Sequence, residues 1–193
     1  MLARTTISLP GKAAALSAAL IAAIGAATIL GAWFFEHVLK LAPCPLCLQQ
    51  RWPYYVAVPL ALVVAIAAAR QGPRVVVAGG LALLALIMLG GAVLGGYHAG
   101  AEWKWWDGPQ DCAGAGYSGG AASDLLRRMQ TARVVRCDEA AWRDPVLRFS
   151  LAGWNVLISL ALAAVAGWGL AATRGNADEN ALGKPYGSSS VSQ

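Results

Sequence analysis

The sequence predicts an all-α integral membrane protein, folded as a four-helix transmembrane bundle with two loops on the same side of the membrane. Of the 193 residues, 58% are hydrophobic and only 13% are charged, whereas a soluble domain usually carries about 25% charged residues. The charges are also bunched, which leaves four uncharged runs, each close to or above the roughly 20 residues that cross a bilayer. A soluble protein can bury one such helix, but four of them in this length indicate membrane spans.

The predicted spans occupy 13–35, 52–69, 75–97 and 150–172. Alanines in the first span and paired glycines in the third allow close helix packing in lipid. In the second span, Pro53 fits a first helical turn, whereas Pro59 lies inside and is expected to kink the helix. The run at 13–35 is longer than the apolar core of a signal peptide, usually about 7–15 residues, and no cleavage site stands out. We therefore expect the first span to be retained.

The three-part organisation follows from the spans. We expect a polar lead at 1–12, a membrane domain at 13–173, and a polar tail at 174–193 that is rich in Gly and Ser and disordered. The long loop after the third span carries seven acidic and seven basic side chains, so it is not a nucleic-acid-binding patch. Ser123 in this loop predicts the cap of a short helix through Arg133, whose apolar face can rest on the membrane surface.

The charges give only partial information on orientation. Four spans put both termini on one side, and the Lys and Arg residues divide six to that side and nine to the other. The positive-inside rule applies to short loops, however, and the short connection from Arg70 to Arg74 is the clearest cytoplasmic signal. Charge alone leaves the orientation open. All four cysteines lie on the side away from the termini, and disulfides persist in the periplasm rather than the cytosol, so we expect cytoplasmic termini and periplasmic loops.

The most informative motif is Cys44-Pro45-Leu46-Cys47, at the start of the second span, with Arg51 four residues after Cys47. A cysteine that opens a helix has a lowered pKa because the N-terminal N–H groups favour the thiolate, which is the nucleophile in disulfide exchange. We expect this effect at Cys47. Arg51 should project from the same helix face, where it can stabilise a thiolate or bind a carbonyl oxygen of a quinone. A snorkelling interfacial anchor is the alternative role for Arg51.

Other uses of the cysteines are less favoured. The Cys44 and Cys47 pair could be a static disulfide or two inert thiols. A zinc site needs four ligands in closed geometry, and Cys112 and Cys137 lie 25 positions apart without a second Cys-x-x-Cys, so we predict no metal. Haem attachment requires a histidine directly after the second cysteine, and Leu48 stands there.

The second pair of cysteines lies in the long loop. Cys112 and Cys137 could form a labile disulfide that opens on demand, or a structural staple for the loop. His98, at the end of the third span, could transfer protons at a quinone site, although a lone histidine there is more often a plain interfacial residue. Two cysteine pairs on one side of a membrane suggest an electron relay.

At this point the residues resemble a known family. The segment from Pro43 to Arg51, Pro-Cys-Pro-Leu-Cys-Leu-Gln-Gln-Arg, is similar to the first-loop signature of the disulfide bond formation protein B family, DsbB. Arg136-Cys137-Asp138-Glu139-Ala140-Ala141-Trp142 and Gly153-Trp154-Asn155 also resemble it, as does the order of spans and cysteine pairs. The resemblance covers roughly 13–172. The loop between the second pair of cysteines matches nothing in the family pattern, which leaves the docking surface for a partner open.

The resemblance implies a role for each residue. Cys112 would be attacked by the reduced periplasmic oxidant DsbA, and Cys137 would be its partner in the resting disulfide. Cys44 would exchange with that pair through a transient bond to Cys137, and Cys47 would face the quinone. The quinone would be held by Arg51, with His98 and Trp142 nearby.

The resemblance therefore implies a quinone-dependent thiol oxidase of the bacterial inner membrane. Its partners would be a DsbA-like protein, the quinone pool and the lipid bilayer, with no nucleic acid. Ubiquinone is the expected acceptor and menaquinone is an alternative. Two other hypotheses use the same residues: a reductive relay that carries electrons outward, and a non-enzymatic four-span protein stapled by disulfides. A relative of vitamin K epoxide reductase is disfavoured because the Cys-x-x-Cys of that family comes late in the chain.

Overall fold

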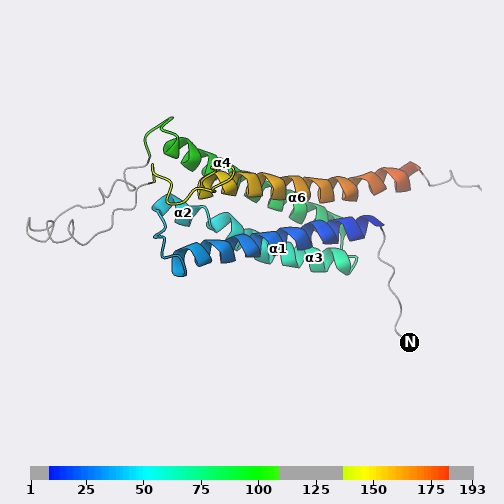
Figure 1. Cartoon of the computed structure of the whole chain (residues 1–193). Helices are drawn as coiled ribbons and strands as arrows, with labels where there is room; N and C mark the ends of the chain where they lie inside the picture. Colours follow the sequence, from blue (N-terminus) through cyan, green and yellow to red (C-terminus); the bar gives the residue numbers. More distant parts are fainter. Residues whose placement is uncertain (1–8, 109–136, 183–193) are drawn as a thin grey trace, which may run out of the picture. The chain divides into compact units, whose positions relative to one another are not determined.

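The structure, a computed structural model, describes residues 9–108 and 137–182, with side chains described for 11–108 and 137–174. The described chain is helical (Figure 1), with the elements α1 (Leu9–His37), α2 (Pro45–Gln49), α3 (Trp52–Ala69), α4 (Arg74–Glu102) and α6 (Leu151–Leu182). Within these residues there is no strand, and an isolated bridge pairs Arg143 with Ser150. The predicted all-α class is confirmed.

Four membrane-length helices are present in the described part of the chain, which confirms the predicted four-span bundle. They cover Gly11–His37, Pro45–Ala69, Arg74–Glu102 and Leu151–Arg174. The third helix runs to Glu102, so His98 lies within it rather than just beyond its end. α6 continues to Leu182, and helix therefore extends into the segment 174–193 that the composition predicted to be disordered. The surface helix predicted from Ser123 to Arg133 lies outside the described residues.

Two compact units divide the chain. The first takes the start of α1, most of α3, the first half of α4 and the end of α6. Its helices approach closely where glycine leaves room: a Cβ at Gly80 would lie 2.4 Å from Val64 Cγ2, and a Cβ at Gly169 would lie 2.5 Å from Ser17 Oγ. The packing role assigned to small residues in lipid fits these contacts.

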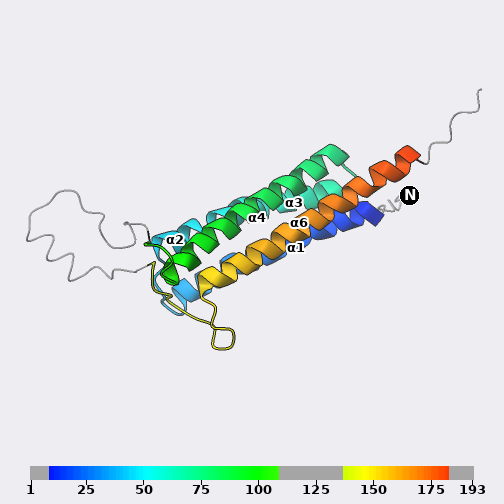
Figure 2. The same ribbon diagram turned by 90° about the horizontal axis from the view of Figure 1, so that it is seen from above.

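The second unit contains 26–55 and the described residues between 88 and 160, and it holds the predicted site. In Figure 2 the short α2, the green end of α4 and the yellow start of α6 gather together. Polar contacts join α3 to α6 here, because the Tyr54 hydroxyl donates to Asn155 Oδ1 at 2.7 Å and lies 2.9 Å from Ser159 Oγ. The α4 backbone lies close to the same place, since a Cβ at Gly95 would be 2.9 Å from Asn155 Nδ2.

Candidate active site

The Cys-x-x-Cys motif forms the start of its own short helix. Cys44 is the N-cap of α2, and its Sγ accepts a hydrogen bond from the Cys47 N–H at 3.1 Å. Pro45 occupies the first helical turn, where its fixed φ is favourable and its missing N–H costs nothing. Cys44 therefore caps the helix, not Cys47 as the sequence suggested. α2 ends at Gln49 and α3 begins at Trp52, so Arg51 lies in a turn between two helices rather than on one continuous helix face.

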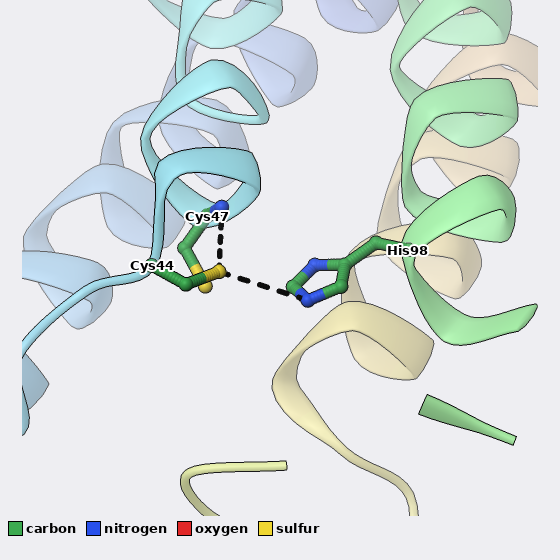
Figure 3. A group of neighbouring side chains, drawn as sticks. All are labelled: Cys44, Cys47 and His98. Carbon is green, nitrogen blue, oxygen red and sulfur yellow. Dashed lines mark hydrogen bonds between the residues drawn. The ribbon is translucent and has the colours of Figure 1, made fainter. Parts of the chain in front are cut away.

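His98 comes from α4 and faces both cysteines (Figure 3). Its Nε2 lies 3.7 Å from Cys44 Sγ, and its Nδ1 lies 2.5 Å from Gln50 Nε2. The same Nε2 lies 3.8 Å from Glu102 Oε1, one helical turn further along α4. Cys44, Gln50, His98 and Glu102 are all buried. The structure thus brings the predicted His98 directly onto the cysteine pair.

The surroundings of Cys44 favour its thiolate. The pKa of Cys44 falls from 9.0 to about 5, mainly because the Cys47 side chain donates a hydrogen bond to it. Burial opposes this change, while the hydrogen bond and the charge of His98 add to it. The sequence predicted a lowered thiol pKa at Cys47, whereas the structure has the lowered pKa at Cys44. At neutral pH this cysteine, when reduced, is an anion.

In this unit Cys137, one member of the second cysteine pair, lies against the first pair. Cys44 and Cys47 are free thiols, whereas Cys137 is disulfide-bonded. Cys137 is 1% exposed and packs in one buried cluster with Cys44 and Leu46, with Cys47 at its edge. Next to Cys137, the Asp138 carboxylate pairs with the Lys104 ammonium. Cys112, the expected partner of Cys137, lies outside the described residues.

A cavity of about 400 Å³ opens beside the cysteine pair. Its wall is mostly apolar and includes four of the residues that the sequence predicted for the site, namely Cys47, Arg51, His98 and Trp142. Cys44 is not part of this wall. The two thiols are therefore placed differently: Cys44 packs against Cys137, and Cys47 borders the cavity.

One ion pair and one aromatic contact hold two of the predicted cavity residues, Arg51 and Trp142. Arg51 Nη1 donates to Glu36 Oε2 at 2.6 Å, and both side chains line the cavity while remaining largely shielded from solvent. The ring of Trp142 packs against Phe35, with ring centroids 5.2 Å apart. Arg51 is thus held by a carboxylate from α1 rather than directed at a cysteine thiolate.

Sequence reasoning did not assign a role to four polar residues around the cavity and the cysteines: Glu36, Gln50, Glu102 and Asn155. Asn155 lines the cavity and is 9% exposed, and its Nδ2 has no hydrogen-bond partner within the described residues. Glu102 Oε2 is likewise buried without such a partner. Asn155 had a signal in the sequence, since a polar residue inside a membrane span is a functional candidate by default. Glu102 was counted as part of the loop, because the uncharged run ends before it.

Comparison with known proteins identifies a family for this chain. No curated protein and no solved structure matches the chain. The family described as Disulfide bond formation protein DsbB matches residues 14–169, a stretch that contains all four cysteines and most of each membrane-length helix. The chain therefore belongs to the DsbB family of membrane oxidoreductases that form disulfide bonds.

Proposed function

We propose that this protein reoxidises a DsbA-like dithiol oxidase in the bacterial periplasm and passes the electrons through its two cysteine pairs to ubiquinone, with menaquinone as the alternative acceptor. The protein would lie in the inner membrane with both termini in the cytoplasm. The observation that carries the proposal is that the two free thiols have different surroundings. Cys44 packs with the disulfide-bonded Cys137, and Cys47 borders the cavity.

In the first half of the reaction, a thiolate of the reduced partner protein attacks Cys112 of the Cys112–Cys137 disulfide, which forms a mixed disulfide and releases Cys137. The second thiolate of the partner then attacks the mixed disulfide, so that the partner leaves oxidised and Cys112 is free. The released Cys137 thiolate attacks Cys44 of an oxidised Cys44–Cys47 pair, which frees Cys47 as a thiolate. Cys112 then attacks Cys137, restores the loop disulfide and releases Cys44. Each exchange breaks one disulfide as it forms another, so two electrons arrive on Cys44 and Cys47.

The low pKa of Cys44 supports this direction. Thiols of low pKa leave faster in disulfide exchange, so Cys44 is a good leaving group in the last step. Stabilising its thiolate also stabilises the reduced pair, which makes the Cys44–Cys47 disulfide a stronger oxidant, as in DsbA itself. A reductive relay carrying electrons outward would need the opposite bias.

The cavity residues fit a quinone head group. A cavity of about 400 Å³ falls within the range of about 300–1,000 Å³ that is usual for small-molecule sites. The unpaired Asn155 Nδ2–H, the Arg51 guanidinium and the His98 ring supply donors for carbonyl oxygens along an apolar wall. When bound, a quinone accepts two electrons and two protons. Cys47 would supply the electrons, and Arg51 would stabilise negative charge at an oxygen.

The test is quinone reduction by the purified protein in detergent, with ubiquinone and reduced DsbA. We expect turnover in the unsubstituted protein, none in Cys47→Ser, and weakened turnover in Arg51→Ala. Arg70→Ala, an exposed arginine outside this unit, is the matched control and should keep full activity. Quinone reduction that survives Cys47→Ser would contradict the assigned exit site. No turnover, with all four cysteines locked in stable disulfides, would favour a structural four-span protein instead.

A further inference from the structure

Three side chains with metal-ligand chemistry meet at the cysteine pair. Cys44 Sγ, Cys47 Sγ and a ring nitrogen of His98 all lie within 4.8 Å of one another. Figure 3 shows both sulfurs beside the His98 ring, which comes from another helix. Cys44 and His98 are buried and Cys47 is half-buried. Two thiolates and an imidazole form a donor set that zinc prefers.

The spacing suits a tetrahedral ion. Zinc bonds of about 2.3 Å to sulfur and about 2.0–2.1 Å to nitrogen place the two ligand atoms roughly 3.6 Å apart at the tetrahedral angle. Cys44 Sγ and His98 Nε2 are 3.7 Å apart. The two atoms therefore need almost no movement to share an ion. Because Cys44 caps α2 through the Cys47 N–H, the loop geometry that brings the two sulfurs together is already fixed.

Glu102 supplies an independent indication of a ligand. Its Oε1 lies 3.8 Å from His98 Nε2, and its Oε2 is buried without a hydrogen-bond partner in the described part of the chain. The Ser150 hydrogen bond and the Arg143 charge offset part of the cost of burying this carboxyl, and a cation beside His98 would offset the cost that remains at Oε2. On the far side of the ring, Gln50 Nε2 lies 2.5 Å from Nδ1. A metal-bound histidine donates its second ring N–H to an acceptor outside the metal's own ligands, so zinc binding requires the Gln50 amide to turn and present its oxygen to Nδ1.

We propose that the reduced form of this site binds one Zn²⁺ ion through Cys44, Cys47 and His98, with the Glu102 carboxylate moving from its place beside His98 into the fourth position. Binding displaces any remaining thiol protons to solvent and changes no oxidation state. The oxidised pair, whose sulfurs are bonded to each other, has no thiolates to offer and does not bind. The sequence counted only cysteines as zinc ligands and so excluded the metal. The other two ligands come from α4, far along the chain.

Zinc at this position would hold the site in its reduced form. If the proposed function holds, an ion bound to Cys44 and Cys47 blocks two steps at once. It prevents disulfide exchange between Cys44 and Cys137, and it prevents electron transfer from Cys47 to a quinone in the cavity. Zinc would then act as a reversible inhibitor that recognises the reduced enzyme, and its effect would be removed by a chelator.

The test uses Co²⁺ as a spectroscopic probe and needs neither quinone nor DsbA. The full-length protein carrying Cys112→Ser and Cys137→Ser is reduced without oxygen in detergent and titrated with Co²⁺, followed by Zn²⁺. We expect one Co²⁺ per chain with a thiolate-to-cobalt absorption band, and loss of the band when Zn²⁺ displaces it. The band should be absent after oxidation of the pair. His98→Ala should weaken binding at least tenfold and Glu102→Gln several-fold. His37→Ala, the other histidine of the chain and exposed, should change nothing.

A reduced protein that gives no thiolate-to-cobalt band would overturn the site, as would unchanged affinity in His98→Ala. If His98→Ala does not fold, X-ray absorption of the zinc-loaded parent protein decides: two sulfur and two lighter ligands support the site, and a shell without sulfur refutes it. Quinone turnover is measured separately with chelator present. Turnover without metal binding removes only this inference, and metal binding without turnover removes only the proposed function.

Discussion

Replacing His98 with alanine should raise the pKa of Cys44. In the structure that pKa drops from 9.0 to about 5, with the Cys47 hydrogen bond as the first cause and His98 as a further one. A drop of this size corresponds to about 5 kcal/mol of preference for the thiolate over the thiol. An opposite charge at this range accounts for roughly one to three pH units of such a drop. We therefore expect His98→Ala to move the titration upward by about that amount, while the Cys47 contribution keeps it below 9.0.

The assay is the ultraviolet absorbance of the thiolate as a function of pH. The reduced protein carries Cys112→Ser and Cys137→Ser, and a chelator is present. Because the pKa of Cys44 is lowered, the thiolate should be present above pH 5 or so and disappear as the pH falls below it. His37→Ala serves as the control and should titrate like the parent protein. A parent midpoint near that of an ordinary thiol, or an identical midpoint in His98→Ala, would refute the reasoning.

Three further predictions concern the cavity and the packing. Glu36→Gln removes the carboxylate that holds Arg51, so the KM for quinone should rise several-fold with little change in kcat in steady-state assays. A fall in kcat with an unchanged KM would contradict a role of Glu36 in positioning Arg51 for quinone binding. Asn155→Leu fills the cavity wall and removes an unpaired donor, and quinone affinity measured by calorimetry should drop about tenfold, whereas unchanged affinity would exclude Asn155 from the site. Gly80→Val would overpack the first unit and destabilise it by about 1–3 kcal/mol, which should appear as a lower Tm. Gly79→Ala is the control and should keep the Tm, because a Cβ there meets nothing within 4 Å. Equal Tm values for the two variants would argue against the close contact at Gly80.

Much of the fold could be predicted because each membrane span corresponds to one long, continuous run of uncharged residues. The bilayer sets the helix length, and an uncharged run of the right length needs no partner to be recognised. Residues near span ends were harder to place. Glu102 belongs to a helix that outlasts its uncharged run by several residues, and only the structure shows that its carboxylate is buried beside His98.

The site was predictable where the chemistry is local and not where it depends on distant segments. Cys44 and Cys47 stand out by spacing alone, and the resemblance to the family covers Arg51 as well. The break in the helix before Trp52 has its cause in Pro53, which has no N–H to donate to the Gln49 carbonyl and whose ring clashes with it. The sequence predicted Pro53 in a first helical turn, but Cys47 and Arg51 were expected to lie on that same helix. The break leaves Arg51 to pair with Glu36, which lies 15 positions earlier on α1. Such pairings depend on how helices pack, and no periodicity in one segment reports them.

Because α2 is short, its stability should depend on whether the loop that contains Cys137 is docked against it. Five residues are far fewer than a helix needs to persist in water, so α2 is stabilised by its surroundings. Leu46 and Cys44 are covered by Cys137, which belongs to the other loop. When that loop moves away, α2 should lose cover and fray. Hydrogen exchange at the Leu48 amide, which bonds to the Cys44 carbonyl at 3.1 Å, would then show whether the second loop is docked.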